Sequence, residues 1–410
     1  MAGTKIYAYT SRDTGGRLIK GKLDASNELA VVSRLRTMGL SPVTIDESTA
    51  GSGLSREIKI AGFGNRNVGL KDLAIMSRQM ATMIASGLSL LKTLNILADQ
   101  TANKKLAATL AEVRTDIEVG GSLSESLAKH PLVFPRLMIY LVRAGEAGGF
   151  LDGALESIAD SLESDAKLRA TIRSALTYPI AVLIMAFAAV IIMLVFIVPV
   201  FQQMFTTLGG ELPLPTQILV TLSQNMIWII PVMLIVIVGF SVWWRQNKHT
   251  DRVRRVVDPW KLKAPVFGQL FTKVAIARFT RNFAAMIGAG VPILQSLAIV
   301  GETSGNWVIE DALKKVQESV RTGNSISGPL ALEPIFPPMV VQMMAVGEDS
   351  GSMETMLTKV ADFYDAEVQS TADALTSLIE PLMIAVIGTI IGAMIIALYM
   401  PIFTIFNQIK

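Results

Sequence analysis

The sequence contains the stretch Ser77-Arg78-Gln79-Met80-Ala81-Thr82-Met83-Ile84-Ala85-Ser86-Gly87 and nearly repeats it as Thr280-Arg281-Asn282-Phe283-Ala284-Ala285-Met286-Ile287-Gly288-Ala289-Gly290. The offset between the copies is 203 residues here and 202 for later matches. An offset held this constant indicates an internal repeat, which decides the architecture before any local pattern does. We therefore expect function to depend on how two related units are placed against each other.

Further matches extend the repeat along both copies. The matched segments are residues 120–124 and 323–327, residues 145–149 and 347–351, Pro179 and Pro381, and residues 199–201 and 401–403. Each copy thus runs into an apolar stretch that begins at its matched proline and ends near the next one.

Three long apolar stretches raise the hydrophobic share of the 410-residue chain to 51%. Residues 180–198, 226–244 and 381–408 contain no charged residue. Each is long enough for a helix that crosses about 30 Å of hydrocarbon, which needs about 20 residues. A buried core helix is the alternative, but three uncharged runs of this length favour transmembrane helices.

Charge is distributed unevenly around these stretches. Basic residues lie before the first stretch and after the second: Lys167, Arg169 and Arg173, then Arg245, Lys248, Arg252, Arg254, Arg255, Lys261 and Lys263. Residues 202–216 contain no Lys or Arg, so by the positive-inside rule this loop faces outward and both large polar segments face the cytoplasm. Residues 1–10 have no apolar signal region, which also predicts a cytoplasmic start. The basic run after the second stretch favours contact with anionic lipid headgroups over nucleic acid, because no aromatic stacking platform interleaves the charges.

These patterns predict an α-helical polytopic membrane protein with two repeated cytoplasmic helical bundles, three transmembrane helices and a small α+β N-terminal domain. The second apolar stretch has no counterpart in either copy and returns the chain to the cytoplasm, so the repeats are parallel rather than inverted. The expected limits are 1–48 for the α+β domain, 49–67 for a linker, 68–176 for the first bundle, 177–200 for the first transmembrane helix, 201–216 for an extracytoplasmic loop, 217–244 for the second transmembrane helix, 245–376 for the second bundle and 377–406 for the third transmembrane helix.

Local patterns predict the elements inside these limits. Residues 6–9 and 17–21 are typical of a hairpin around Gly15-Gly16, followed by a helix that Ser26 or Asn27 caps and Gly39 ends, and by a strand at 42–45. In the first bundle, apolar residues at spacings of three and four predict a helix from Leu70 to Gly87, and further helices at 88–102, 104–119, 122–129, 135–144 and from about 150. The last carries Leu151, Leu155, Ile158 and Leu162 inward. Short connections predict antiparallel neighbours, and the second copy repeats the pattern between residues 270 and 375.

The sequence offers no catalytic, cofactor-binding or metal-binding constellation. The motif Gly16-x-x-x-x-Gly21-Lys22 is followed by Leu23 and lies in the hairpin, so we interpret it as a turn and not a nucleotide-binding loop. The chain has two histidines and no cysteine, with no spacing typical of a transition-metal site and no base beside a serine nucleophile. Acidic residues near the repeated glycines (Glu146, Asp152, Glu348, Asp349) fit no established calcium loop.

The repeated Gly-Glu-x-x-Gly segments are the most specific local signal. Their residues are Gly145, Glu146 and Gly149 in the first copy, and Gly347, Glu348 and Gly351 in the second. The glycines permit a tight bend and close backbone approach. The glutamate is expected either to cap the following helix or to accept a bond from the facing one. We interpret the segment first as a helix–helix corner and second as a partner contact.

Glu380-Pro381 is expected to open the third transmembrane helix, since proline suits a first helical turn and a carboxylate suits the positive helix end. The functional alternative is that Glu380 meets a positive charge on a substrate helix at the membrane edge. The first copy has Tyr178 at this place. Gly388 and Gly392 form a small-xxx-small pair, which is typical of a helix-packing surface within or between protomers.

Taken together, these residues resemble the GspF/PilC family, the inner-membrane platform proteins of type II secretion and type IV pilus assembly. The resemblance covers essentially the whole chain and is carried by the small N-terminal domain, both Gly-x-Ser-Leu/Ile-Ser turns, both Gly-Glu-x-x-Gly corners, Tyr178-Pro179, Glu380-Pro381 and the layout of the transmembrane helices. The outer loop from Phe201 to Leu214, with Leu212-Pro213 after Gly209-Gly210-Glu211, resembles the pilus-assembly members more than the secretion members.

The resemblance implies a homo-oligomer in the inner membrane without catalysis of its own. Its implied partners are a hexameric assembly ATPase on the cytoplasmic side, pilin or pseudopilin transmembrane helices and other inner-membrane assembly proteins. Glu146 and Glu348 are the expected structural corners at the ATPase interface, and Glu380 the expected pilin contact. A small-solute transporter or an oligomeric channel is the alternative class; three spans are few for a transporter, and no span carries the polar stripe of a channel.

Overall fold

The structure is a computed structural model that describes residues 5–12, 18–25, 28–48, 67–207, 212–248 and 250–408. The chain divides into two compact units, Met1–Asn65 and Arg66–Lys410. The predicted linker lies almost wholly outside the described residues. The smaller unit and the larger unit each have their own hydrophobic core.

The smaller unit is a three-stranded antiparallel sheet with one helix. Strands β1 (Lys5–Arg12) and β2 (Leu18–Ala25) pair as a hairpin, and β3 (Ser41–Ser48) pairs with the other edge of β1. Helix α1 (Glu28–Thr37) buries Val31 and Leu35 against Tyr7. Gly39 follows it at φ 73°, as expected for a residue that ends a helix. The predicted hairpin, helix and third strand are confirmed; Gly15-Gly16 and the caps Ser26 and Asn27 lie outside the described residues.

The first helical module follows the predicted order. It consists of α2 (Leu70–Ala85), α3 (Leu90–Gln100), α4 (Lys104–Glu118), α5 (Leu123–Ala128), α6 (Arg136–Gly148) and the start of α7 (Leu151–Ile192). On α2, Leu73, Met76 and Met80 are buried, because their three- and four-residue spacing puts them on one helix face. Gly87 ends the turn after α2 at φ 83°. The inward face of α7 is also as predicted, with Leu155 and Ile158 fully buried.

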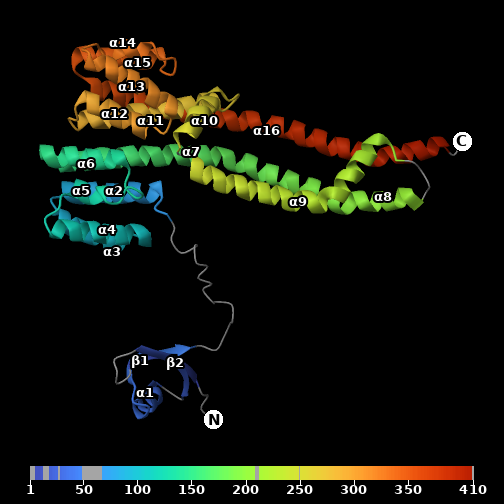
Figure 1. Cartoon of the computed structure of the whole chain (residues 1–410), viewed down its shortest axis with the longest axis horizontal. Helices are drawn as coiled ribbons and strands as arrows, with labels where there is room; N and C mark the ends of the chain where they lie inside the picture. Colours follow the sequence, from blue (N-terminus) through green and yellow to red (C-terminus); the bar gives the residue numbers. More distant parts are fainter. Residues whose placement is uncertain are drawn as a thin grey trace. The chain divides into compact units, whose positions relative to one another are not determined.

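The second module repeats this order. It consists of α11 (Gly268–Gly288), α12 (Ile293–Thr303), α13 (Trp307–Arg321), α14 (Ser327–Ala331), α15 (Pro338–Ser350) and the start of α16 (Met353–Gln408). Helix α10 (Asp251–Lys263) precedes it and has no counterpart in the first module. Figure 1 shows the two modules as layers on either side of α7 and α16, and their buried residues form one continuous core.

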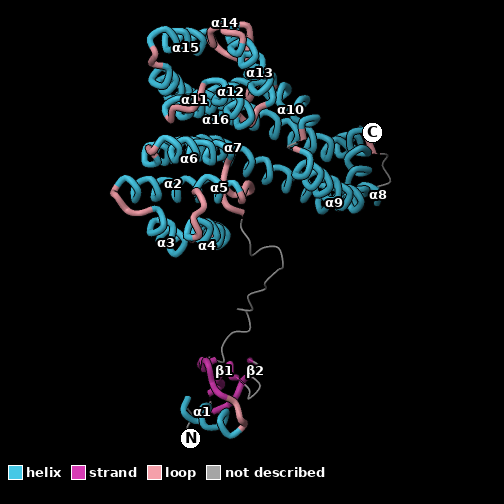
Figure 2. The backbone as a smooth tube through the Cα atoms, turned by 60° about the vertical axis from the view of Figure 1, so that its left-hand side comes forward, coloured by secondary structure: helices cyan, strands magenta, loops and turns pink. Residues whose placement is uncertain are grey.

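Both long helices leave the modules and continue as apolar spans. α7 passes through a π-helical turn, η1 (Met193–Ile197), into α8 (Val198–Thr207), and α16 continues without a break. Helix α9 (Leu214–Asn247) returns along them, as Figure 2 shows. These three helices are long and apolar enough to cross a membrane. The predicted helical membrane fold with two repeated modules, three spans and a small α+β domain is thereby confirmed.

One expectation about the spans is wrong. Glu380-Pro381 does not open a helix, because Pro381 lies inside the 56-residue helix α16, as Pro179 lies inside α7. A proline inside a helix removes one backbone N–H donor, which a long helix tolerates where other groups satisfy the freed carbonyl. The proline therefore marks where the long helix leaves the module and not where a helix begins. We call the module side of the spans the proximal end and the other side the distal end.

Candidate functional site

The glutamate of the first Gly-Glu-x-x-Gly segment joins two sequence motifs. The carboxylate of Glu146 accepts hydrogen bonds from the backbone N–H groups of Leu123 at 2.6 Å and Ser124 at 3.1 Å. Both donors lie in the first turn of α5, where backbone N–H groups have no partner within the helix. A negative charge is favourable at this helix end. Glu146 therefore caps α5 from the last turn of α6.

The second copy has the same arrangement. Glu348 accepts from the N–H groups of Ile326 at 2.9 Å and Ser327 at 3.3 Å, and from the Ser327 hydroxyl at 3.2 Å. Of the two expected roles, the structure has the second one: each glutamate accepts from a facing helix, α5 or α14, and does not cap the helix that follows it. Each also lies within its helix and not in a turn, so α6 continues past the predicted end at Ala144 to Gly148.

The glycines of these segments have two distinct uses. A Cβ added at Gly145 would lie 2.6 Å from the Ala154 Cβ atom, and one at Gly347 would lie 2.9 Å from the Met353 Cα atom, so both permit close helix approach. Gly149 and Gly351 instead adopt φ of 73° and 67° in the turns. Within the described ranges, no group of three acidic or histidine residues is placed to hold a metal ion.

The repeated stretch quoted first carries an ion-pair pattern that sequence reasoning missed. Arg78 on α2 contacts Asp160 and, at 2.7 Å, Glu163 on α7; Arg281 on α11 contacts Asp362 at 2.9 Å and Asp365 at 2.7 Å on α16. The hydrogen bond from Arg78 lowers the pKa of Glu163, and the bonds to Glu163 and Asp160 raise that of Arg78. The signal was present, since an arginine recurs at the 203-residue offset with acidic partners at 202.

Polar contacts also join the two modules to each other. The Ser164 hydroxyl donates to Asp365 at 2.9 Å, and Arg278 bonds Asp165 at 2.8 Å. A cavity of about 600 Å³ lies between α7 and α16 here, lined by the acidic partners of both arginines. The two long helices are thus held together on the module side before they reach the membrane.

At the distal end, two hydroxyls of α9 bond carbonyls that prolines leave free. Pro199 has no N–H, so within η1 the carbonyl five residues earlier, at Leu194, loses its donor, and the Ser223 hydroxyl donates to it. Pro401 likewise leaves the carbonyl of Ala397 without its usual partner four residues on, and the Thr216 hydroxyl donates to that carbonyl. Both hydroxyls are buried in a small apolar cluster where the three spans meet.

At the proximal end, residues of the two repeat spans line an open groove, which we call the proximal groove. Its volume is about 330 Å³, and it is lined by Tyr178, Pro179, Val182, Ile379, Glu380, Met383, Ile384, Ile387 and Gly388. Apart from Glu380 the lining is almost entirely apolar. Among the residues that the structure describes, the Glu380 carboxylate has no hydrogen bond or ion pair. The structure thus brings Tyr178 and Glu380, matched positions of the repeat, to one groove.

Gly388 of the small-residue pair lines this groove, and neither it nor Gly392 packs closely against another helix of the described protomer. A Cβ built at Gly388 or at Gly392 would meet no atom within 4 Å in the described protomer. The expected packing surface is therefore not used within the protomer, and only contact between protomers remains as its predicted role.

Comparison with known proteins assigns this arrangement to a family. A family model described as type II secretion system protein F matches residues 76–199 and 279–401, and one for the N-terminal domain of the same protein matches residues 1–46. The chain belongs to the type II secretion system protein F family. The two matched segments are the two copies of the repeat, from the arginine-bearing helix to the distal proline.

Relatives in this family span nearly the whole chain. The type IV pilus assembly protein PilC of Thermus thermophilus is 42% identical over 407 residues, covering 99% of each chain. PilC of Myxococcus xanthus is 39% identical over 410 residues, covering 99% of this chain and 96% of its own. Type II secretion system protein F of Vibrio cholerae is 31% identical over 404 residues, covering 98% of both.

Proposed function

We propose that the chain is the inner-membrane platform protein of a type IV pilus or type II secretion-like filament assembly machine. Its modules would lie in the cytoplasm, where a hexameric assembly ATPase would act on them, and its spans would guide pilin or pseudopilin helices into the filament. The observation that carries the proposal is the continuity of α7 and α16 from module to span. A movement imposed on either module is transmitted directly to one wall of the proximal groove. The cytoplasmic orientation is supported by the basic residues on the module side of the spans.

Within this proposal the proximal groove receives the transmembrane helix of a filament subunit. Its walls are apolar and exposed, with Ile384 67% accessible, as suits contact with an apolar helix within lipid. An unpaired carboxylate at the membrane edge is costly unless it faces a polar partner, so Glu380 is placed to bond a positive group of that helix. Glu146 and Glu348 would keep the corners rigid where the ATPase acts, and Gly388 and Gly392 would pack protomer against protomer.

Crosslinking tests the groove directly, because the natural chain has no cysteine. Tyr178→Cys or Ile384→Cys should form disulfides with cysteines placed in the pilin or pseudopilin span. Val236→Cys, on the exposed side of α9, is the matched control and should not. Equal crosslinking at all three positions would remove the groove proposal.

Filament assembly tests the proposed contact of the Glu380 carboxylate with the filament subunit. Glu380→Ala should abolish or strongly reduce surface filaments seen by electron microscopy while the protein level is unchanged. Glu156→Ala removes another exposed carboxylate of a long helix, one with no hydrogen bond or ion pair among the described residues, and should leave assembly normal. Normal filaments with Glu380→Ala would discard its role in subunit contact.

The wider proposal is tested by copurification and by topology. The assembly ATPase and a filament subunit should copurify with the chain from membranes. A cysteine at Leu132 or Leu332, both highly exposed on the modules, should react with an impermeant maleimide only after the cells are opened. Labelling in intact spheroplasts would place the modules outside and overturn the proposal, and ion flux in liposomes would instead support a channel.

A further inference from the structure

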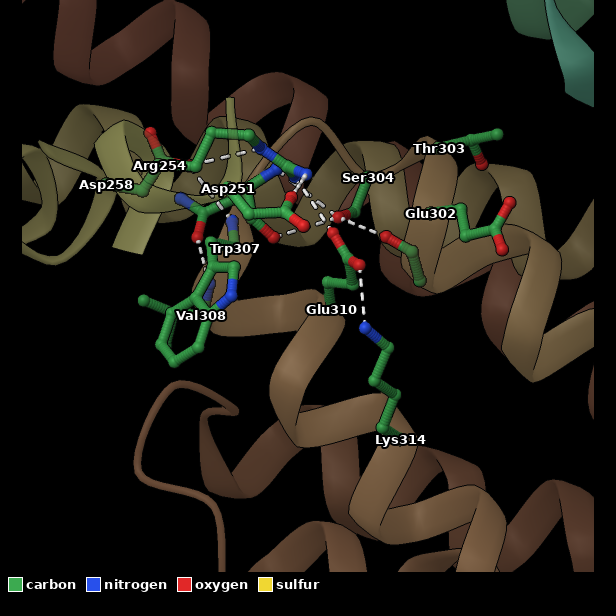
Figure 3. Close-up of polar contacts among 12 residues, drawn as sticks. Asp251, Arg254, Asp258, Glu302, Thr303, Ser304, Trp307, Val308, Glu310 and Lys314 are labelled. Atoms are coloured by element: carbon green, nitrogen blue, oxygen red, sulfur yellow. Dashed lines mark hydrogen bonds and ion pairs between the residues drawn. The ribbon is translucent and has the colours of Figure 1, made fainter. Parts of the chain in front are cut away.

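Helix α10, which precedes the second module, has no counterpart in the first module, and its two faces differ in chemistry. One face packs against the module through buried polar contacts, which Figure 3 shows. Asp258, only 4% exposed, accepts from the backbone N–H of Trp307 at 3.0 Å and from Lys261 at 3.0 Å. Arg254 pairs with Glu310 of α13 at 3.0 Å. The orientation of α10 about its own axis is therefore determined by the module.

The other face carries apolar and basic side chains that nothing in the described chain covers. Val256 is 63% exposed and Trp260 is 78% exposed. These two residues and the basic residues Arg252 and Lys263 are spaced three or four positions apart. This spacing places all four on one side of the helix. Neither Arg252 nor Lys263 has an ion-pair partner in the part of the chain that the structure describes. A large exposed tryptophan flanked by unpaired cations is unusual for a surface that faces only water.

The position of α10 relates this face to the membrane. It begins four residues after α9 ends, and the last turns of α9 carry Phe240, Trp243 and Trp244, which pack on one another. Aromatic residues at the end of a span are typical of the headgroup region. Arg245 and Lys248, also exposed and without an acidic partner in the described ranges, continue the basic surface from α9 to α10. Figure 1 shows α10 at the level where α16 leaves the modules.

We propose that α10 is an interfacial helix that binds anionic phospholipid headgroups through Arg252 and Lys263 and inserts Val256 and Trp260 beside their acyl chains. An amphipathic helix with basic and aromatic residues on its exposed side binds the membrane surface through burial of apolar area and through electrostatic attraction to anionic lipids. The charge of the patch selects anionic over zwitterionic lipid. Since the opposite face is held to α13, the lipid surface determines the tilt of the second module.

Spin labels on a chain without native cysteines test the depth of this face. The purified full-length protein carries Val256→Cys or Trp260→Cys in vesicles of phosphatidylcholine with phosphatidylglycerol, and Leu332→Cys is the exposed control on the same module. Labels at 256 and 260 should show several-fold lower collision with a water-soluble nickel complex and higher collision with oxygen than the label at 332. Nickel collision as high as at 332 would overturn the proposal.

Charge removal tests the lipid selectivity. Arg252→Gln with Lys263→Gln should shift the phosphatidylglycerol fraction needed for burial of the label at 260 to a higher value. Lys71→Gln with Lys92→Gln removes the same charge from exposed residues of the first module and should leave that fraction unchanged. Equal shifts for both pairs, or burial that is independent of phosphatidylglycerol in the unmodified protein, would exclude recognition of anionic headgroups.

Discussion

The distal and proximal ends of the spans both contain prolines of the repeat. They differ in whether helix α9 is hydrogen-bonded to the repeat spans there. At the distal end, Thr216 and Ser223 of α9 donate to the carbonyls that Pro401 and Pro199 leave free. At the proximal end, Pro179 of α7 and Glu380 of α16 line an open groove, and no described residue of α9 contributes to its lining. Among the described residues, α9 thus bonds to the two repeat spans at the distal end and does not reach the groove between them. A displacement of the modules should therefore open or close the proximal groove while the distal end stays together.

Removing both distal hydroxyls should have the largest effect on stability. Thr216→Val with Ser223→Ala leaves two carbonyls unpaired in an apolar cluster. The loss of each hydrogen bond between membrane helices should lower the free energy of unfolding by about 0.6 to 1.7 kcal/mol. We expect a lower Tm in nanodiscs. Thr221→Val is the matched control, because the Thr221 hydroxyl bonds only Gln217 of its own helix. A Tm shift no larger than that of Thr221→Val would show that the distal end does not depend on these bonds.

Restoring a backbone donor should make one hydroxyl dispensable. In Pro401→Ala the regained N–H can bond the Ala397 carbonyl, so Thr216→Val should cost less in that background than in the natural chain. A double-mutant cycle on Tm measures this coupling, which we expect to be about 1 kcal/mol. Pro381→Ala serves as the control background, and coupling of the same size there would contradict the assignment.

Changing the proximal carboxylate should leave stability almost untouched. Glu380→Gln removes a charge that is exposed and, among the described residues, unpaired, so the free energy of unfolding should change by less than about 0.5 kcal/mol. Thermal unfolding in nanodiscs measures it. A large loss of stability would mean that the proximal end, like the distal one, is held together by contacts within the protomer.

Lowering the pH should have the smallest effect on stability. Because the Arg78 hydrogen bond depresses the pKa of Glu163, the pair stabilises the contact between α2 and α7 above the unfolded pKa, near 4.5, and this contribution is lost as the pH falls through the lower folded value. Both side chains are partly exposed, so solvent screens the pair. The pH dependence of Tm below that point should be weaker in Glu163→Gln. An unchanged pH dependence would remove this role.

Sequence patterns predicted the helices well because their causes are local. Leu73, Met76 and Met80 lie within about two turns of one helix, and the glycine that ends the turn after α2 follows closely. They predicted the motif glutamates less well. The pattern left open whether Glu146 caps the following helix or accepts from a facing one, and it did not name the partners, which are the N–H groups at Leu123 and Ser124, in another motif of the same repeat. Nothing in the spacing of the two motifs states that they touch.

The repeat, the three apolar spans, the order of helices and the small N-terminal sheet could all be predicted from sequence, because periodicity, glycine geometry and the length of an uncharged run are properties of neighbouring residues. Three features required the folded chain: which carbonyl each α9 hydroxyl bonds, that Pro381 lies inside a continuous helix, and that Tyr178 and Glu380 line one groove. These depend on how helices far apart in the chain cross, since a buried polar group takes its partner from whichever helix packing brings within reach.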